Sequence, residues 1–93
     1  MILNWSSNYK RAFKKIIKGN SAYKEEILAA MRLLEQDPFL PKLKSHKLKG
    51  ILENSWACSV AFDLRIIFKF VKNPQTYETE ILLMDIGTHE EVY

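Results

Sequence analysis

Two stretches of alternating residues, joined at Asp63, constrain the fold of this chain more than any other feature. In the first stretch every second residue is apolar: Trp56, Cys58, Val60 and Phe62. The second stretch repeats the pattern: Leu64, Ile66, Phe68 and Phe70. A period of two indicates half-buried β-strands, and a tight turn near Asp63 makes them a hairpin. The sequence therefore requires a sheet with one face packed against other elements.

The residues before position 37 have the periodicity of two helices that can cover this face. Ser6 or Ser7 can cap the first helix, whose apolar stripe is Tyr9, Phe13, Ile16 and Ile17. We expect Gly19–Asn20 to end it with a left-handed cap and Ser21 to cap the second helix. The second stripe is Tyr23, Ile27, Ala30, Met31 and Leu34. Asp37–Pro38 stops this helix, and the short connection predicts an antiparallel helical hairpin.

The remaining segments complete an α+β domain of order β-α-α-β-β-β over residues 1–93. Ile2–Trp5 is predicted to be a short strand, and Pro38–Ser45 a loop. The last strand is Glu78–Ile86, which is nearly all apolar from Ile81 and is therefore expected in the interior of the sheet. We predict an N-terminal strand and a helical hairpin packed on one face of a mainly antiparallel sheet.

Charge is distributed unevenly along the 93 residues, although the net charge is only +3. Residues 1–24 contain six Lys or Arg and no acid, and residues 42–49 contain four lysines, whereas residues 73–93 contain five acids and no base. Clustered lysines favour a phosphate-bearing partner, although a solvated helix face explains the first cluster equally well. Cys58, the only cysteine, lies in an apolar run and is expected to be buried and inert.

No apolar run is long enough for a membrane span, and the first residues lack the pattern of a signal peptide. We therefore expect a cytoplasmic protein without a membrane partner.

Strand parity brings three functional side chains together. If Trp56 and Phe68 pack under the helices, then Ser59 and Arg65 point to the other face of the sheet. There Arg65 lies close to Gly87, which we interpret as a hinge after the last strand. His89 and Tyr93 follow that glycine. We therefore expect a guanidinium, an imidazole and a phenol on one surface, with histidine suited to proton transfer.

Three runs, in their order and spacing, resemble the RelE/ParE toxin superfamily, and within it the YafQ-like and RelE/StbE-type mRNA interferases. They are Ser45–Gly50, Trp56–Val60 with Asp63–Phe68, and Asp85–Tyr93. The resemblance implies a cofactor-free and metal-free endoribonuclease that cuts mRNA in the ribosomal A site. It also implies a cognate antitoxin protein that holds the enzyme inactive.

The resemblance also implies site residues. YafQ-like toxins have functional residues at the positions of His46, Asp63, His89 and Tyr93, and RelE-like toxins at those of Arg65 and Tyr93. We expect Arg65 to hold the phosphate and His89, then His46, to transfer protons, with Tyr93 stacking or donating a proton. Asp63 would fix a tautomer or act as a base. Four lysines are expected to bind RNA: Lys42, Lys44, Lys47 and Lys49.

The chain departs from both groups at Ala57 and Ser59, where relatives carry lysines or a histidine. Two other functions therefore stay open: a ParE-like gyrase inhibitor and an RNA-binding module with weak or no catalysis. The paired histidines favour RNA cleavage, and their spacing suggests no metal site. Structural roles also remain possible, with Asp63 as a turn residue, Arg65 in an ion pair and Tyr93 as a C-terminal anchor.

Overall fold

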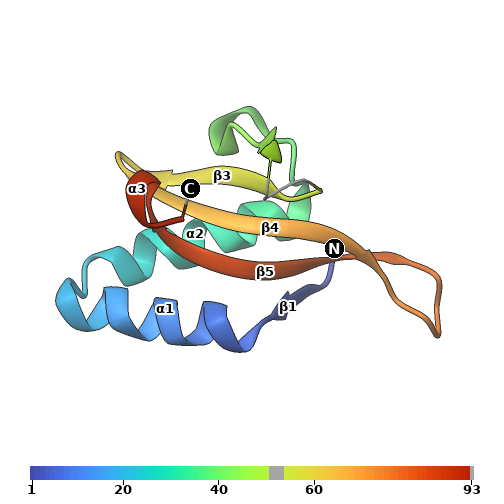
Figure 1. Cartoon of the computed structure of the whole chain (residues 1–93), viewed down its shortest axis with the longest axis horizontal. Helices are drawn as coiled ribbons and strands as arrows, with labels where there is room; N and C mark the ends of the chain where they lie inside the picture. The colour runs from blue at the N-terminus through green and yellow to red at the C-terminus, as the bar shows by residue number, and fades with distance from the viewer. Residues whose placement is uncertain (51–53, 93) are drawn as a thin grey trace.

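The computed structural model describes residues 1–50 and 54–92, in which a helical hairpin packs on a mixed sheet (Figure 1). The elements are β1 (Leu3–Trp5), α1 (Ser7–Gly19), α2 (Tyr23–Gln36), the 3-10 turn η1 (Pro41–Leu43), β2 (His46–Lys47), β3 (Trp56–Ala61), β4 (Leu64–Lys72), β5 (Thr79–Thr88) and α3 (His89–Val92). The strand order is β1-β5-β4-β3-β2, with β1 parallel to β5 and the other pairs antiparallel. The predicted α+β architecture is confirmed.

The first helix, α1, begins with a predicted cap, but it does not end with the predicted one. The Oγ of Ser6 accepts a hydrogen bond from the backbone N–H of Tyr9 at 3.0 Å, as an N-cap does. The predicted left-handed cap at Gly19–Asn20 is wrong, because Gly19 is the last helical residue and Asn20 is extended, with φ −153°. The N–H of Asn20 still closes the final turn on the carbonyl of Ile16 at 2.9 Å.

The second helix begins without the predicted serine cap. Ala22 occupies the N-cap position, and the side-chain oxygen of Asn20 accepts from its N–H at 3.1 Å. A short Asn side chain that turns back on the chain two residues later makes the cap at Ser21 unnecessary. The helix ends before Asp37–Pro38, as predicted.

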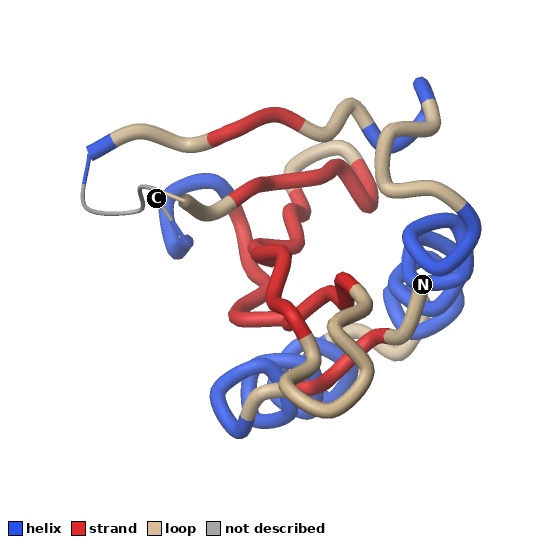
Figure 2. The backbone as a smooth tube through the Cα atoms, turned by 90° about the vertical axis from the view of Figure 1, so that its right-hand side faces the viewer, coloured by secondary structure: helices blue, strands red, loops and turns tan. Residues whose placement is uncertain are grey.

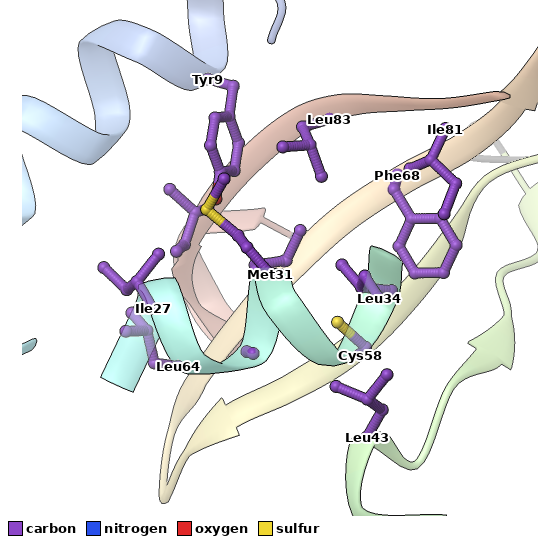
Figure 3. Close-up of a cluster of buried hydrophobic side chains, with 13 residues drawn as sticks. Tyr9, Ile27, Met31, Leu34, Leu43, Cys58, Leu64, Phe68, Ile81 and Leu83 are labelled. Atoms are coloured by element: carbon purple, nitrogen blue, oxygen red, sulfur yellow. The ribbon is translucent and has the colours of Figure 1, made fainter. Parts of the chain in front are cut away.

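The alternating residues of β3 and β4 face the two sides of the sheet as the sequence predicted. The main core contains the inward residues of β3 and β4 together with the buried stripe of α2, and Figure 3 shows these side chains around Met31 and Cys58. The ring of Tyr9 is buried here too, and its hydroxyl has no hydrogen-bond partner among the described residues. Burial raises the pKa of the Cys58 thiol to about 12, which makes it the inert core residue expected.

The opposite face of the sheet carries a second, smaller cluster, formed by Ala57, Ile67 and Val92 with Leu48 and Met84 against it. Val92 belongs to α3, so this helix packs on the face that the hairpin leaves open. Figure 2 shows α1 and α2 along one side of the strands and α3 on the other. We call this second surface the open face.

Several segments differ from the sequence prediction. The predicted loop Pro38–Ser45 contains η1, and His46–Lys47 adds an edge strand to β3. The last strand ends two residues later than predicted, so Gly87 lies inside β5 rather than at a hinge. Phe62, expected on the buried face, lies in the β3–β4 turn and is 99 % exposed, because the register shifts between Ser59 and Ala61 before the turn.

Among the described residues, no helix is long and apolar enough to cross a membrane.

Candidate active site

Arg65 lies on the open face, at the end of the sheet where α3 begins. Its cross-strand neighbours are Ser59 on β3 and Gly87 on β5. The Nη1 atom donates to the carbonyl oxygens of Ala61 and Leu64, both at 3.2 Å. These two bonds hold the half-buried guanidinium at the base of the β3–β4 turn, and its other N–H groups can bind an anion.

Gly87 allows α3 to pack directly on the sheet. A Cβ at this position would lie 3.1 Å from Oε1 of Glu91 and 3.1 Å from Cγ1 of Val92. Contacts this short are tighter than most Cβ atoms make, so a larger residue at position 87 would require Glu91 and Val92 to shift. Arg65 is the cross-strand partner of Gly87, so its backbone lies beside the part of β5 that leads into α3.

A capping box starts α3. The Oγ1 of Thr88 accepts from the N–H of Glu91 at 3.3 Å, and Oε1 of Glu91 accepts from the N–H of Thr88 at 2.9 Å. These bonds, with a smaller contribution from Lys15, hold the pKa of Glu91 below its usual value. The cap fixes the position at which His89 leaves the sheet. His89 is exposed, at the first position of α3.

His46 approaches the same face from the β2 edge. It is exposed and pairs with Ala57 of β3, a member of the cluster that contains Val92 of α3. Its Nδ1 lies 3.2 Å from the carbonyl oxygen of Lys44. Because a carbonyl oxygen only accepts, we assign the proton to Nδ1, and the neutral ring then has its basic lone pair on Nε2.

The four lysines divide between two hollows. Lys42 and Lys44 line a cavity of about 450 Å³ beside the β3–β4 turn, which we call the turn cavity. The charged, polar and aromatic residues that line it are Glu26, Lys42, Lys44, Ser59, Phe62 and Arg65. Lys47 and Lys49 line a second hollow with Leu48 and Gly50. All four lysines are exposed. The basic run therefore flanks His46 on both sides in sequence, and its lysines line two separate hollows.

One predicted site residue lies apart from the turn cavity. Asp63 is exposed in the β3–β4 turn and lines another hollow with Lys15, Tyr23 and Thr88, not the turn cavity beside Arg65. Tyr93 lies outside the described residues. Within residues 1–50 and 54–92, no group of three or more His, Cys, Asp or Glu side chains could hold a metal ion, and we assign no metal ligands.

Sequence reasoning missed Glu26 and Phe62, which line the turn cavity, and the role of Thr88 and Glu91 in fixing α3. The Thr-x-x-Glu spacing at residues 88–91 is a signal for a helix start that could have located α3. Neither Glu26 nor Phe62 carries such a signal, because their proximity arises only from the packing of α2 beside the turn.

Comparison with known proteins agrees with the fold. YafQ from E. coli strain BL21(DE3) is 16% identical and superposes with a TM-score of 0.78 over 98% of this chain and 96% of that chain. A YoeB/ParE toxin from Agrobacterium tumefaciens is 18% identical, with a TM-score of 0.76 over 96% of this chain and 99% of that one. A chain of the E. coli DinJ–YafQ toxin–antitoxin complex is 19% identical, with a TM-score of 0.75 and coverage of 98% and 94%.

A search of curated proteins gave no match. The family model described as "Bacterial toxin of type II toxin-antitoxin system, YafQ" matches residues 1–93, the whole chain. The protein therefore belongs to the YafQ family of bacterial toxins from type II toxin–antitoxin systems.

Proposed function

We propose that this toxin is an endoribonuclease that cleaves mRNA on the ribosome and that a cognate antitoxin holds it inactive. The observation that carries the proposal is the pairing of Arg65 with Gly87, two residues before His89. In the proposed site the guanidinium of Arg65 binds the phosphate and the imidazole of His89, at the start of α3, acts on the same substrate. The known complex of DinJ with YafQ from E. coli supports an antitoxin as the partner.

The reaction that fits these groups uses the RNA as its own nucleophile. A base removes the proton of a 2′-hydroxyl, whose oxygen then bonds to the adjacent phosphorus. The bond from phosphorus to O5′ breaks, and an acid gives a proton to the departing oxygen. The products are a 2′,3′-cyclic phosphate and a 5′-hydroxyl. Charge on the pentavalent phosphate must be stabilised at the same time.

The proposed residues divide the steps of this scheme among them. Arg65 holds the scissile phosphate, because a guanidinium binds two phosphate oxygens at once. His46, with its proton on Nδ1, offers the basic Nε2 for the 2′-hydroxyl. His89 protonates the leaving oxygen. Tyr93 would stack on a base or donate a proton, and the lysines from 42 to 49 would bind the RNA backbone.

Asp63 has a weaker claim than the other residues. The hollow that it lines does not include Arg65, and a short acidic residue is common in a tight turn. We keep its catalytic role as a proposal that one variant can test: Asp63→Asn preserves the turn chemistry and removes the charge.

The deciding experiment is induction of the toxin in growing cells, followed by mapping of mRNA 5′ ends. We expect cuts in phase with codons, and we expect His89→Ala to reduce cleavage by about 10²- to 10⁴-fold, the usual contribution of an acid or base. Glu90→Ala is the matched control, because Glu90 is the exposed neighbour on α3 and takes no part in the capping box. Blocked translation without cuts, or signs of DNA damage, would contradict the proposal and favour a gyrase-type target.

A further inference from the structure

Phe62 lies in a turn, where its side chain packs against no part of the hydrophobic core among the described residues. It occupies the two-residue turn between β3 and β4, with Ala61 paired to Leu64 on either side. Turns of this kind favour Gly, Asn, Asp or Ser. The phenyl ring is 99 % exposed, so it contributes nothing to the core. A single exposed apolar side chain is common on a protein surface, so the relevant observation is that Phe62 borders a cavity that cationic side chains also line.

The ring borders the turn cavity, whose volume of about 450 Å³ is in the range of small-ligand sites. The cavity is formed by α2, η1 and the ends of β3 and β4. Its floor is apolar, with Ala30, Leu33 and Val60 among the lining residues. An aromatic ring at the rim and an apolar floor suit a flat, partly apolar group.

Charge around the turn cavity is asymmetric. Lys42 and Lys44 come from the η1 side and Arg65 from β4, whereas Glu26 comes from α2. An anion is favoured beside the cations and opposed by Glu26. A carboxylate accepts hydrogen bonds, so a neutral group with N–H donors suits the α2 side. The occupant that matches is one with an anionic end and an uncharged ring with amino groups, which describes a nucleotide.

Lys44 connects the turn cavity to the proposed acid–base residues. Its backbone is left-handed, with φ 50° and ψ 41°, which is uncommon for a residue with a side chain. Its carbonyl oxygen meets Nδ1 of His46 at 3.2 Å, while its side chain lines the turn cavity. Lys44 therefore belongs to the wall of the turn cavity and also contacts the imidazole of His46.

We propose that the turn cavity binds a nucleotide of the RNA that flanks the scissile phosphate, with Phe62 stacked on its base. The inference rests on the proposed function, since it supplies the substrate contact for that reaction. In this arrangement Phe62 is a positioning residue: it holds the RNA and does not touch the reacting atoms.

Binding of a fluorescently labelled single-stranded RNA with 2′-O-methyl groups, which block cleavage, tests the proposal. Base–aromatic stacking predicts that Phe62→Ala weakens binding by about 5- to 150-fold. Phe62→Tyr should bind like the wild type, because it keeps a stacking ring, whereas Phe62→Leu should bind like Phe62→Ala. Tyr77→Ala is the matched control: Tyr77 is 74 % exposed near the other hairpin turn and lines none of the described cavity walls.

Salt dependence separates stacking from charge. Phe62→Ala should leave the slope of log affinity against log salt unchanged, whereas Lys44→Ala should reduce it by about one. Thermal unfolding of the variants checks the fold; substitutions of so exposed a ring are expected to leave Tm unchanged.

Wild-type affinity in Phe62→Ala, or equal affinity in Phe62→Leu and Phe62→Tyr, would overturn the proposal. So would binding of an acidic antitoxin peptide that depends on Phe62 when RNA binding does not. The two proposals fail separately. If the toxin cuts mRNA but RNA binding ignores Phe62, only the nucleotide site is refuted. If RNA binding depends on Phe62 but no mRNA is cut, the nuclease proposal fails and the site stands.

Discussion

Replacing Gly87 with alanine tests how the fold positions the candidate active site. The added methyl group would lie 3.1 Å from Oε1 of Glu91 and Cγ1 of Val92, and 3.2 Å from Cβ of Glu91. Ordinary contacts begin at about 3.4 Å, so α3 must retreat from the sheet by a few tenths of an ångström. The backbone of Gly87 is not left-handed, so the effect isolates the contact rather than backbone strain.

The expected loss of stability follows from the contacts that hold α3 on the sheet. Val92 is 8% exposed and anchors the second cluster, and full loss of a buried valine costs about 1.5–3 kcal/mol. Overpacking of this kind costs about 1–3 kcal/mol. Because a four-residue helix can yield without losing its whole contact, we expect Gly87→Ala to lower the free energy of unfolding by about 1–2 kcal/mol. In a domain of this size, Tm falls by roughly 4–8 °C per kcal/mol.

Activity should fall more than stability. In the proposed mechanism, moving α3 displaces His89 from the phosphate that Arg65 holds, and misplacement of a catalytic group by about 1 Å can cost roughly 10²-fold. We expect at least a tenfold loss of mRNA cleavage at a temperature where the variant is fully folded. Urea or thermal unfolding measures the first effect and cleavage on programmed ribosomes the second.

Gly19→Ala is the control. A Cβ at Gly19 meets nothing within 4 Å, and the residue ends α1 without a left-handed backbone. Alanine there should raise stability by about 0.4–1 kcal/mol, because it restricts the unfolded chain, and should leave cleavage unchanged. Wild-type Tm and wild-type cleavage in Gly87→Ala would refute the reasoning about the close approach of α3.

Three further predictions concern the core and the acid response. The buried hydroxyl of Tyr9 has no partner among the described residues, so Tyr9→Phe should keep or raise stability, by up to about 1–3 kcal/mol in urea unfolding; a clear loss would indicate a partner. The raised pKa of Cys58, about 12, and its burial predict no reaction with a thiol reagent until the protein unfolds, and fast labelling of the native protein would contradict this. The side-chain amides of Asn73 and Asn4 donate to Glu80 and hold its pKa below the ordinary 4.5; this contribution to stability is complete above pH 4.5 and is lost as the pH falls through the lowered pKa. Asn4→Ala should therefore flatten the acid-induced loss of stability below pH 4.5, and an unchanged pH profile would show that the amide has no such effect.

The sequence predicted the elements whose periodicity is long. The alternation from Trp56 to Phe70 gave the β3–β4 hairpin and its buried face, and the apolar stripes gave both helices. Parity also predicted the face of Arg65, close to the glycine of the last strand, although the pairing of these two residues appears only in the structure. These predictions succeed because burial of one face fixes the register over many residues at once.

Short elements and long-range neighbours could not be predicted in the same way. β2 has only two residues and α3 only four, too few for a periodic pattern. Phe62 continued the alternation in sequence, but the register shift and the turn removed it from the core. The turn cavity depends on Glu26, Lys44 and Arg65, which come from three separate elements. Only the packing of α2 and η1 against the hairpin brings them together.

The most direct test of the central claim is the chemistry of the cut ends. We predict that mRNA cleaved by the toxin on programmed ribosomes carries a 2′,3′-cyclic phosphate and a 5′-hydroxyl, and that one 2′-deoxy sugar at the cut position abolishes cleavage there. Fragments with a 5′-phosphate, or undiminished cutting beside the 2′-deoxy sugar, would contradict attack by the 2′-hydroxyl and with it the roles assigned to Arg65, His46 and His89.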